Sequence, residues 1–123
     1  MTKAAALHQF FSAFGMPAYT ADSVPAGAAF PYLTYELVTS AWEGGEVSLA
    51  VQLWYKTQDG AAPNAKAEEV SAAIGYGGKM VRCDEGLIWL KRGSPWCQSA
   101  RDESDSEIKR RCLNVIAEYL TRN

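Results

Sequence analysis

The sequence has few of the residues from which enzymes build active sites. Its single histidine, His8, lies beside the apolar stripe of an expected helix, so we interpret it as a structural or surface residue. There is no GxSxG nucleophile elbow and no Gly-Lys-Ser/Thr phosphate loop, and the glycine-rich run Gly75–Gly78 follows a helix instead of opening one. Carboxylate pairs such as Glu68-Glu69 are explained by an exposed helix surface. The sequence therefore predicts a protein that is not an enzyme.

Cysteine is also scarce. The three cysteines, Cys83, Cys97 and Cys112, are odd in number and lack CxxC spacing, so neither a disulfide framework nor a zinc site is indicated. We interpret them as buried free thiols. The acidic segment 102–107 lacks the glycine and glutamate positions of a calcium-binding loop. We therefore expect no metal and no other cofactor.

Long apolar runs and a strong charge of either sign are missing as well. No stretch approaches the roughly 20 apolar residues of a membrane span, and Met1-Thr2-Lys3 opens a polar-interrupted helix instead of a signal peptide. The formal charge of −2 gives no global attraction to nucleic acid, although Lys91-Arg92 and Lys109–Arg111 could form a local basic patch. The 123 residues suit one soluble domain, 1–123, made in the cytoplasm.

What the sequence does contain is a clear alternation of helix and strand signals. Thr2 can cap a first helix that Gly15 ends, and Gly75 can end a second one. Val47 to Tyr55 alternates cleanly between two faces, as a strand does. The expected order is a helix with apolar residues from Ala4 to Phe14, a loop at Pro17–Pro31, strands at Tyr32–Val38 and Val47–Tyr55 joined through Ser40–Glu46, a helix at Asn64–Ile74, and a hairpin of Lys79–Cys83 and Leu87–Arg92 turning at Asp84–Gly86.

The final run, 108–120, fits two kinds of element. Ile108, Cys112, Val115 and Tyr119 follow a helical spacing, whereas Leu113, Val115, Ala117 and Tyr119 follow that of a strand. Periodicity alone slightly favours the helix.

Several segments taken in order carry a resemblance that covers most of the chain. They are Phe30–Tyr35, Gly45–Leu49, Ala73–Gly78, Gly86–Pro95 and the run from Ile108. In this arrangement the chain resembles the tail terminator and tail-completion proteins of long-tailed bacteriophages and prophages. None of the segments is a mechanistic fingerprint, so the resemblance lies in their order and spacing.

The resemblance implies that the run 108–120 is a strand that closes the sheet after the acidic loop, and we predict a strand there. Together with the other elements, this gives an α+β fold with two helices packed on a mainly antiparallel sheet of about five strands.

In function, the resemblance implies a structural virion protein. Its subunits would form a ring, usually of six, that caps the tail tube and docks it to the head connector protein. The expected partners are further copies of the chain, the tail tube protein and the connector, with DNA passing through unbound and no membrane involved. The chain would occur in the virion, and in the host cytoplasm during assembly. The alternatives are another phage neck or minor capsid protein, or a peptide- or ligand-binding module with a groove lined by Trp54, Trp89 and Trp96.

Two sets of residues are candidates for contacts with partners. Tryptophan buries a large area at low entropic cost, so we predict interface roles for four residues, although Trp54 and Trp89 also suit the core. These residues are Trp42, Trp54, Trp89 and Trp96. The acidic loop is predicted to face the lumen of the ring, where negative charge would keep DNA from adhering. Its acidic residues are Asp102, Glu103, Asp105 and Glu107.

Overall fold

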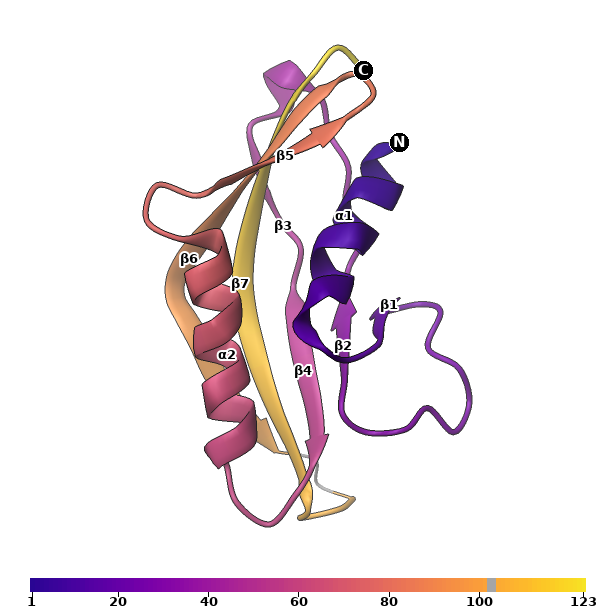
Figure 1. Cartoon of the computed structure of the whole chain (residues 1–123), viewed down its shortest axis with the longest axis vertical. Coiled ribbons are helices and arrows are strands. Elements are labelled where there is room, and N and C mark those ends of the chain that lie inside the picture. Colours follow the sequence, from indigo (N-terminus) through magenta and orange to yellow (C-terminus); the bar gives the residue numbers. More distant parts are fainter. Residues whose placement is uncertain (102–103) are drawn as a thin grey trace.

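The computed structural model describes residues 1–101 and 104–123 as two α-helices packed on one face of a curled sheet (Figure 1). Two short 3-10 helices, η1 and η2, accompany them. In chain order the elements are α1 (Lys3–Phe11), η1 (Ser12–Phe14), β1 (Ala18–Thr20), β2 (Tyr32–Tyr35), η2 (Trp42–Gly44), β3 (Glu46–Ser48), β4 (Val51–Lys56), α2 (Ala61–Ile74), β5 (Lys79–Cys83), β6 (Gly86–Arg101) and β7 (Ile108–Thr121).

The helix ends follow the sequence signals. Thr2 caps α1, because its hydroxyl accepts a hydrogen bond from the backbone N–H of Ala5 at 3.1 Å. Gly15 follows η1 in the left-handed conformation, with φ of 77°. Helix α2 ends before Gly75 as predicted but begins at Ala61, three residues before the expected start, because the Asp59 carboxylate accepts from the Ala61 N–H at 2.8 Å.

The sheet runs in the order β1-β2-β4-β7-β6-β5, and β3 also pairs with β7. The pair β1–β2 is parallel, and the other pairs are antiparallel. The α+β class is confirmed, but the sheet has seven strands instead of about five. Its edges are β1 and β5.

Two of the additional strands come from segments that were expected to behave differently. Ala18–Thr20, inside the expected loop, pairs with Leu33–Tyr35 as β1. The expected strand Val47–Tyr55 is split in two, because Ala50 has a φ of 42° and interrupts the extended backbone. The first expected strand, Tyr32–Val38, ends at Tyr35.

Strands β6 and β7 form the long axis of the sheet (Figure 1). The run 108–120 is a strand, as the resemblance predicted, and β7 lies between β6 on one side and β4 and β3 on the other. We expected strand β6 to end at Arg92. It instead continues to Arg101, with a register irregularity between Arg92 and Cys97. At Gly93 a Cβ would lie 2.2 Å from the Asn114 side-chain amide, so a larger residue at this bulge would displace that side chain.

The core lies between the sheet and the helices. Along β7 every second residue from Arg111 to Thr121 is buried on the side of the helices. The other strands and both helices supply the remaining apolar side chains. Those with no exposed area are Ala6, Leu7, Phe11, Leu33, Leu49, Val51, Leu53, Val70, Ile88, Leu90, Val115, Ala117 and Tyr119. Neither helix of the described residues is long and apolar enough to cross a bilayer.

Candidate functional site

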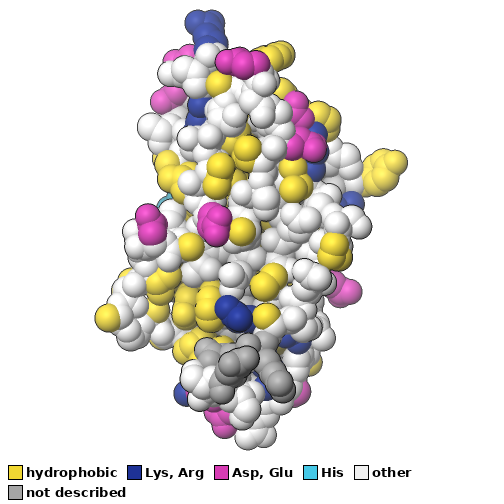
Figure 2. Space-filling view, turned by 180° about the vertical axis from the view of Figure 1, so that it is seen from behind, with side chains coloured by type: hydrophobic (Ala, Val, Ile, Leu, Met, Phe, Trp, Pro, Cys, Tyr) yellow, Lys and Arg dark blue, Asp and Glu magenta, His cyan; other side chains and the backbone are white. Residues whose placement is uncertain are grey.

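Aromatic and charged side chains gather on the sheet face away from the helices, and we call it the open face. Figure 2 views the molecule from this side and shows apolar side chains over β2 and β4 at its lower left. The strand register places the members of this surface in rows across the sheet. The rows are Met80, Trp89, Glu118 and Glu46; Lys91, Ile116 and Ser48; and Ala100, Arg110, Trp54 and Tyr32.

Charge at the upper end of the open face is internally paired. The Lys91 ammonium donates to Glu46 at 2.7 Å and to Glu118 at 2.8 Å, and it lies 3.8 Å from the centre of the Trp89 ring. Its hydrogen bond to Glu118, followed by that to Glu46, raises the pKa of Lys91. The Trp89 indole N–H donates to the carbonyl of Gly77 at 2.8 Å. Trp89 is therefore half-buried within a satisfied polar cluster.

An aromatic row occupies the lower end. The Trp54 ring stacks on Tyr32 with centroids 5.9 Å apart and an interplanar angle of 12°, and its indole N–H donates to Thr34 at 2.9 Å. The Arg110 guanidinium lies 5.0 Å from the Trp54 ring centre. The Tyr32 ring also meets Phe30 at 5.3 Å. This aromatic row is the broadest half-buried apolar feature of the open face.

The four candidate tryptophans do not share a surface. Trp54 and Trp89 pair with β7 residues eight positions apart, which corresponds to about 26 Å along a strand. Trp96 packs on the helix side, where its indole N–H donates to the Ala67 carbonyl of α2 at 3.1 Å. The expected groove lined by Trp54, Trp89 and Trp96 is therefore wrong. Trp42 is 65% exposed in η2, which fits the predicted interface role best of the four.

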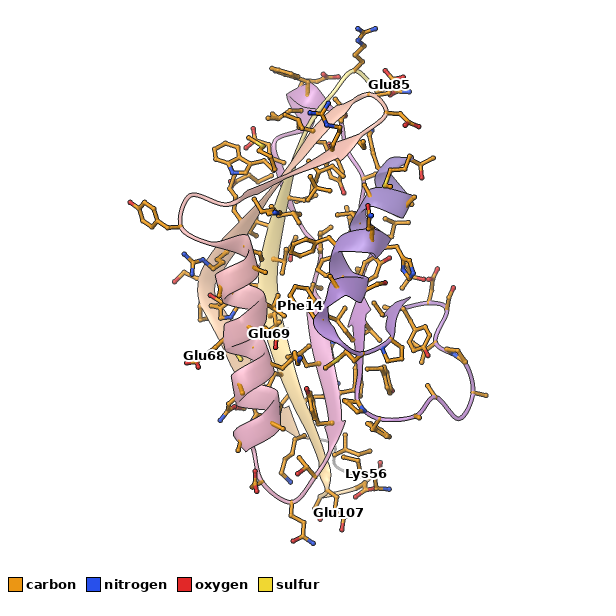
Figure 3. All side chains as sticks on the ribbon, viewed as in Figure 1. Phe14, Lys56, Glu68, Glu69, Glu85 and Glu107 are labelled. Atoms are coloured by element: carbon orange, nitrogen blue, oxygen red, sulfur yellow. The ribbon has the colours of Figure 1, made fainter. Side chains whose placement is uncertain are left out.

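The acidic loop is described only in part, because Asp102 and Glu103 lie outside the described residues. Asp105 pairs with Lys56 of β4 at 3.3 Å and accepts from the Glu107 N–H at 2.9 Å. Figure 3 shows Lys56 and Glu107 at one end of the molecule and Glu85 at the other. Half of the loop's described charge is thus engaged with β4.

The basic run Lys109–Arg111 does not form one patch. Arg110 faces the aromatic row, whereas Arg111 points to the helix side, is 8% exposed and donates to the Asn64 side chain at 2.8 Å. Consecutive residues of a strand point to opposite faces, so a basic run in a strand divides its charge. The three residues therefore offer no continuous track for a phosphate backbone.

The remaining reactive groups are placed as follows. His8 is exposed on α1, where its ring nitrogens lie 3.3 Å from the Ser12 hydroxyl and 3.5 Å from that of Tyr35. Cys83 is buried, but Cys97 and Cys112 are half-buried on opposite faces, so the expectation of burial holds fully only for Cys83. Among the described residues, no group of three or more His, Cys, Asp or Glu side chains could hold a metal ion.

One exposed residue was missed by the sequence reasoning. Tyr76 has a relative exposure of 100% in the turn between α2 and β5, although the sequence showed it only as part of a helix stop. The signal that could have revealed it is an aromatic residue between glycines, where the side chain has no neighbours along the chain. Tyr76 and Trp42 are the two most exposed aromatic side chains that the structure describes.

Comparison with known proteins gives a likeness in fold. No protein-family model matches the chain, and no curated protein matches its sequence. A solved structure described as the virion of a native gene transfer agent particle contains a chain of similar fold, with a TM-score of 0.61 and 21% sequence identity. The likeness covers 94% of this chain and 92% of that one. At this level of identity the comparison establishes a shared fold over nearly the whole of both chains.

Proposed function

We propose that this protein is a structural subunit of a phage-like virion and, more specifically, a tail terminator or head-tail joining subunit. The observation that carries the proposal is the whole-length likeness in fold to a chain from a gene transfer agent virion. The likeness covers 94% of this chain and 92% of that one, so it is not limited to one supersecondary motif. The order of segments that resembles tail terminators supports the finer assignment.

In the proposed function the protein acts through binding surfaces and not through catalysis. Copies of the chain form a ring, with six subunits as the resemblance implies, that caps the tail tube and presents a docking face to the head connector. A closed ring needs two different patches on each subunit, because its contacts are head-to-tail. The exposed Trp42 lies in η2, directly before β3, and it is available to a further partner.

Surface chemistry within the subunit is consistent with this role. At the upper end of the open face Lys91 pairs inside the chain with Glu46 and Glu118. The two most exposed aromatic side chains of the described residues, Tyr76 and Trp42, lie outside the strands. Such a subunit can remain unassembled in the host cytoplasm and associate with the tail tube when the tube is complete.

Electron microscopy of particles from the producing phage or prophage tests the proposal. A strain lacking the gene is compared with the same strain carrying it on a plasmid. A terminator predicts abnormally long tubes beside filled, tailless heads, and both defects disappear on complementation. Normal tails with failed heads assign the chain to the neck or capsid instead, and normal infectious particles refute a structural role.

A further inference from the structure

Tyr76 stands on a turn that is held in place from within the chain. The residues on either side of it, Gly75 and Gly77, have φ of 78° and 81°, and the Gly78 N–H donates to the Gly75 carbonyl at 3.2 Å. The Trp89 indole clamps the turn through the Gly77 carbonyl, and a Cβ at Gly78 would lie 2.5 Å from that indole nitrogen. The turn therefore presents a fully exposed tyrosine in a defined position.

Such a side chain is suited to anchor a protein contact. A tyrosine ring buries a large area with only two rotatable bonds, and its hydroxyl can bond to a polar group at the end of a pocket. Tyr76 makes no contribution to the core, since all of its surface is open to solvent. One cation reaches the same end of α2, because the Arg92 guanidinium donates at 2.9 Å to Ser71, which lies five residues before Tyr76.

The other edge of the sheet carries a hollow with matching chemistry. It lies where β1 and β2 end and is lined by Thr20, Ala21, Asp22, Ser23, Glu36, Leu37 and Val38. Leu37 is 44% exposed, and the hollow also holds the carboxylates of Asp22 and Glu36. The hollow is fixed by backbone hydrogen bonds, from Ala21 to Tyr35 at 2.8 Å and from Glu36 to Leu49 at 2.8 Å.

The positions of these two features set how copies can meet. Tyr76 directly precedes β5, one edge strand, and the hollow follows β1, the other edge strand. Figure 1 shows the turn between α2 and β5 on the left of the sheet and β1 on the right. One copy cannot bring its own tyrosine to its own hollow, but neighbouring copies placed side by side can, each using both edges. This is a heterologous contact, which repeats identically around a ring.

We propose that Tyr76 of one copy inserts into the hollow at Leu37 of a second copy, with Arg92 facing the carboxylates of Asp22 and Glu36. The occupant is a second copy, because one chain carries both halves of the contact on opposite edges of its sheet. The Tyr76 ring and its neighbouring cation lie at one edge, and Leu37 with the two carboxylates lies at the other. The contact deepens the proposed function, since it supplies the head-to-tail association on which a ring depends. It would occur equally in any assembly of this chain that repeats side by side.

Photo-cross-linking tests the contact directly. Tyr76 is replaced by benzoylphenylalanine, which the open surroundings tolerate, and the cross-linked peptides are identified by mass spectrometry. The matched control carries the same amino acid at Glu85, which is exposed in the turn between β5 and β6. The experiment is run on the purified protein at rising concentration and on particles from the producing host. We expect a covalent dimer that joins position 76 to residues 20–38 of another copy, with no such product from position 85.

The outcomes separate the contact from the proposed function. A cross-link to the helix side near Phe10 or Phe14, to the open face, or to no second copy in either sample overturns the contact. If the chain is found at the tail end of particles with position 76 cross-linked elsewhere, the function stands without the contact. A cross-link to residues 20–38 in solution, with the chain absent from particles, supports the contact and overturns the function.

Association measured by analytical ultracentrifugation gives a second test. Tyr76→Ala and Leu37→Glu are each expected to weaken association at least about tenfold, as the loss of a central aromatic anchor does. Tyr76→Phe keeps the ring and should weaken association less, and Glu85→Ala, in the exposed turn between β5 and β6, should leave association unchanged. Circular dichroism checks that the variants are folded. Association of Tyr76→Ala at the wild-type level contradicts the contact.

Discussion

The two faces of the sheet differ in what satisfies their side chains. On the helix side the strands bury aliphatic and aromatic residues completely, as at Leu90, Val115 and Tyr119. On the open face the same strands carry half-buried aromatic rings and charges that pair with each other, as at Lys91 with Glu118. The comparison teaches that one face holds the fold together, whereas the other carries polar and aromatic side chains that remain partly open to solvent. The two most exposed aromatic side chains, Tyr76 and Trp42, lie outside the strands.

Two leucines of β6 that point to opposite faces provide the strongest test of the difference between the two faces. Leu90→Ala removes a side chain with no exposed area and should lower the free energy of unfolding by about 3 kcal/mol. Leu87→Ala removes a half-buried side chain of the open face and should cost less than about 1 kcal/mol. Chemical denaturation measures both. Equal losses would show that the open face is part of the core.

A tryptophan pair extends the comparison to residues that the sequence grouped together. Trp96→Ala should cost about 2 to 3 kcal/mol, because the ring packs on the core and its N–H bonds to Ala67. Trp42→Ala should change stability by no more than about 0.5 kcal/mol, since the side chain is 65% exposed. Thermal denaturation of the two variants side by side checks this. A large loss for Trp42 would place it in the core and remove it from the candidate interface.

A buried tyrosine sharpens the description of the helix side. The Tyr119 hydroxyl donates to the Val38 carbonyl at 2.6 Å, so Tyr119→Phe should cost about 1 kcal/mol. Burial, with Cys83 nearby, raises the pKa of Tyr119 from 10 to about 12. The unfolded chain therefore loses this proton first as pH rises, and the native state loses stability between pH 10 and about 12. Urea titrations across this range should show a smaller fall for the phenylalanine variant, and identical pH profiles would contradict the assignment.

A small effect on stability is expected at the acidic loop. Neutralising Asp102, Glu103, Asp105 and Glu107 as amides should cost less than about 1 kcal/mol and removes the partly exposed Asp105–Lys56 pair. If the loop faces the lumen of a ring, the variant should eject DNA more slowly, because phosphates lose a repelling surface. Ejection kinetics of complemented particles measure this. Unchanged kinetics would remove the loop from the lumen.

Local signals in the sequence were sufficient for the elements whose partners are close along the chain. The cap at Thr2, the stop at Gly75 and the hairpin turn after Cys83 all depend on contacts within a few residues, and each is found where the sequence indicated. The resemblance, not the periodicity, gave the correct strand at 108–120. Periodicity was ambiguous there because the open face of β7 also carries apolar residues, including Ile116 and Leu120, which imitate a helical stripe.

The candidate site was harder to predict than the fold. The sequence found the tryptophans but could not show that Trp96 lies across the sheet from Trp54 and Trp89, because the bulge between Arg92 and Cys97 is set by the pairing with β7. From the sequence, Tyr76 was interpreted only as part of the glycine-rich segment that ends the second helix. Exposure of a side chain depends on what the rest of the chain places around it, and in this turn nothing is placed there.

The sequence by itself determined the α+β class, the helix cap at Thr2, the helix stop at Gly75 and the lack of catalytic motifs, because these follow from residue type and local spacing. Only the tertiary structure decided which face of each strand is covered, which groups surround the charges of Lys91 and Arg110, and which aromatic side chains remain exposed. It also placed Tyr76 and the hollow at Leu37 on opposite edges of the sheet. The reason is physical: strand register and packing join residues far apart in the chain, and no local pattern encodes those distances.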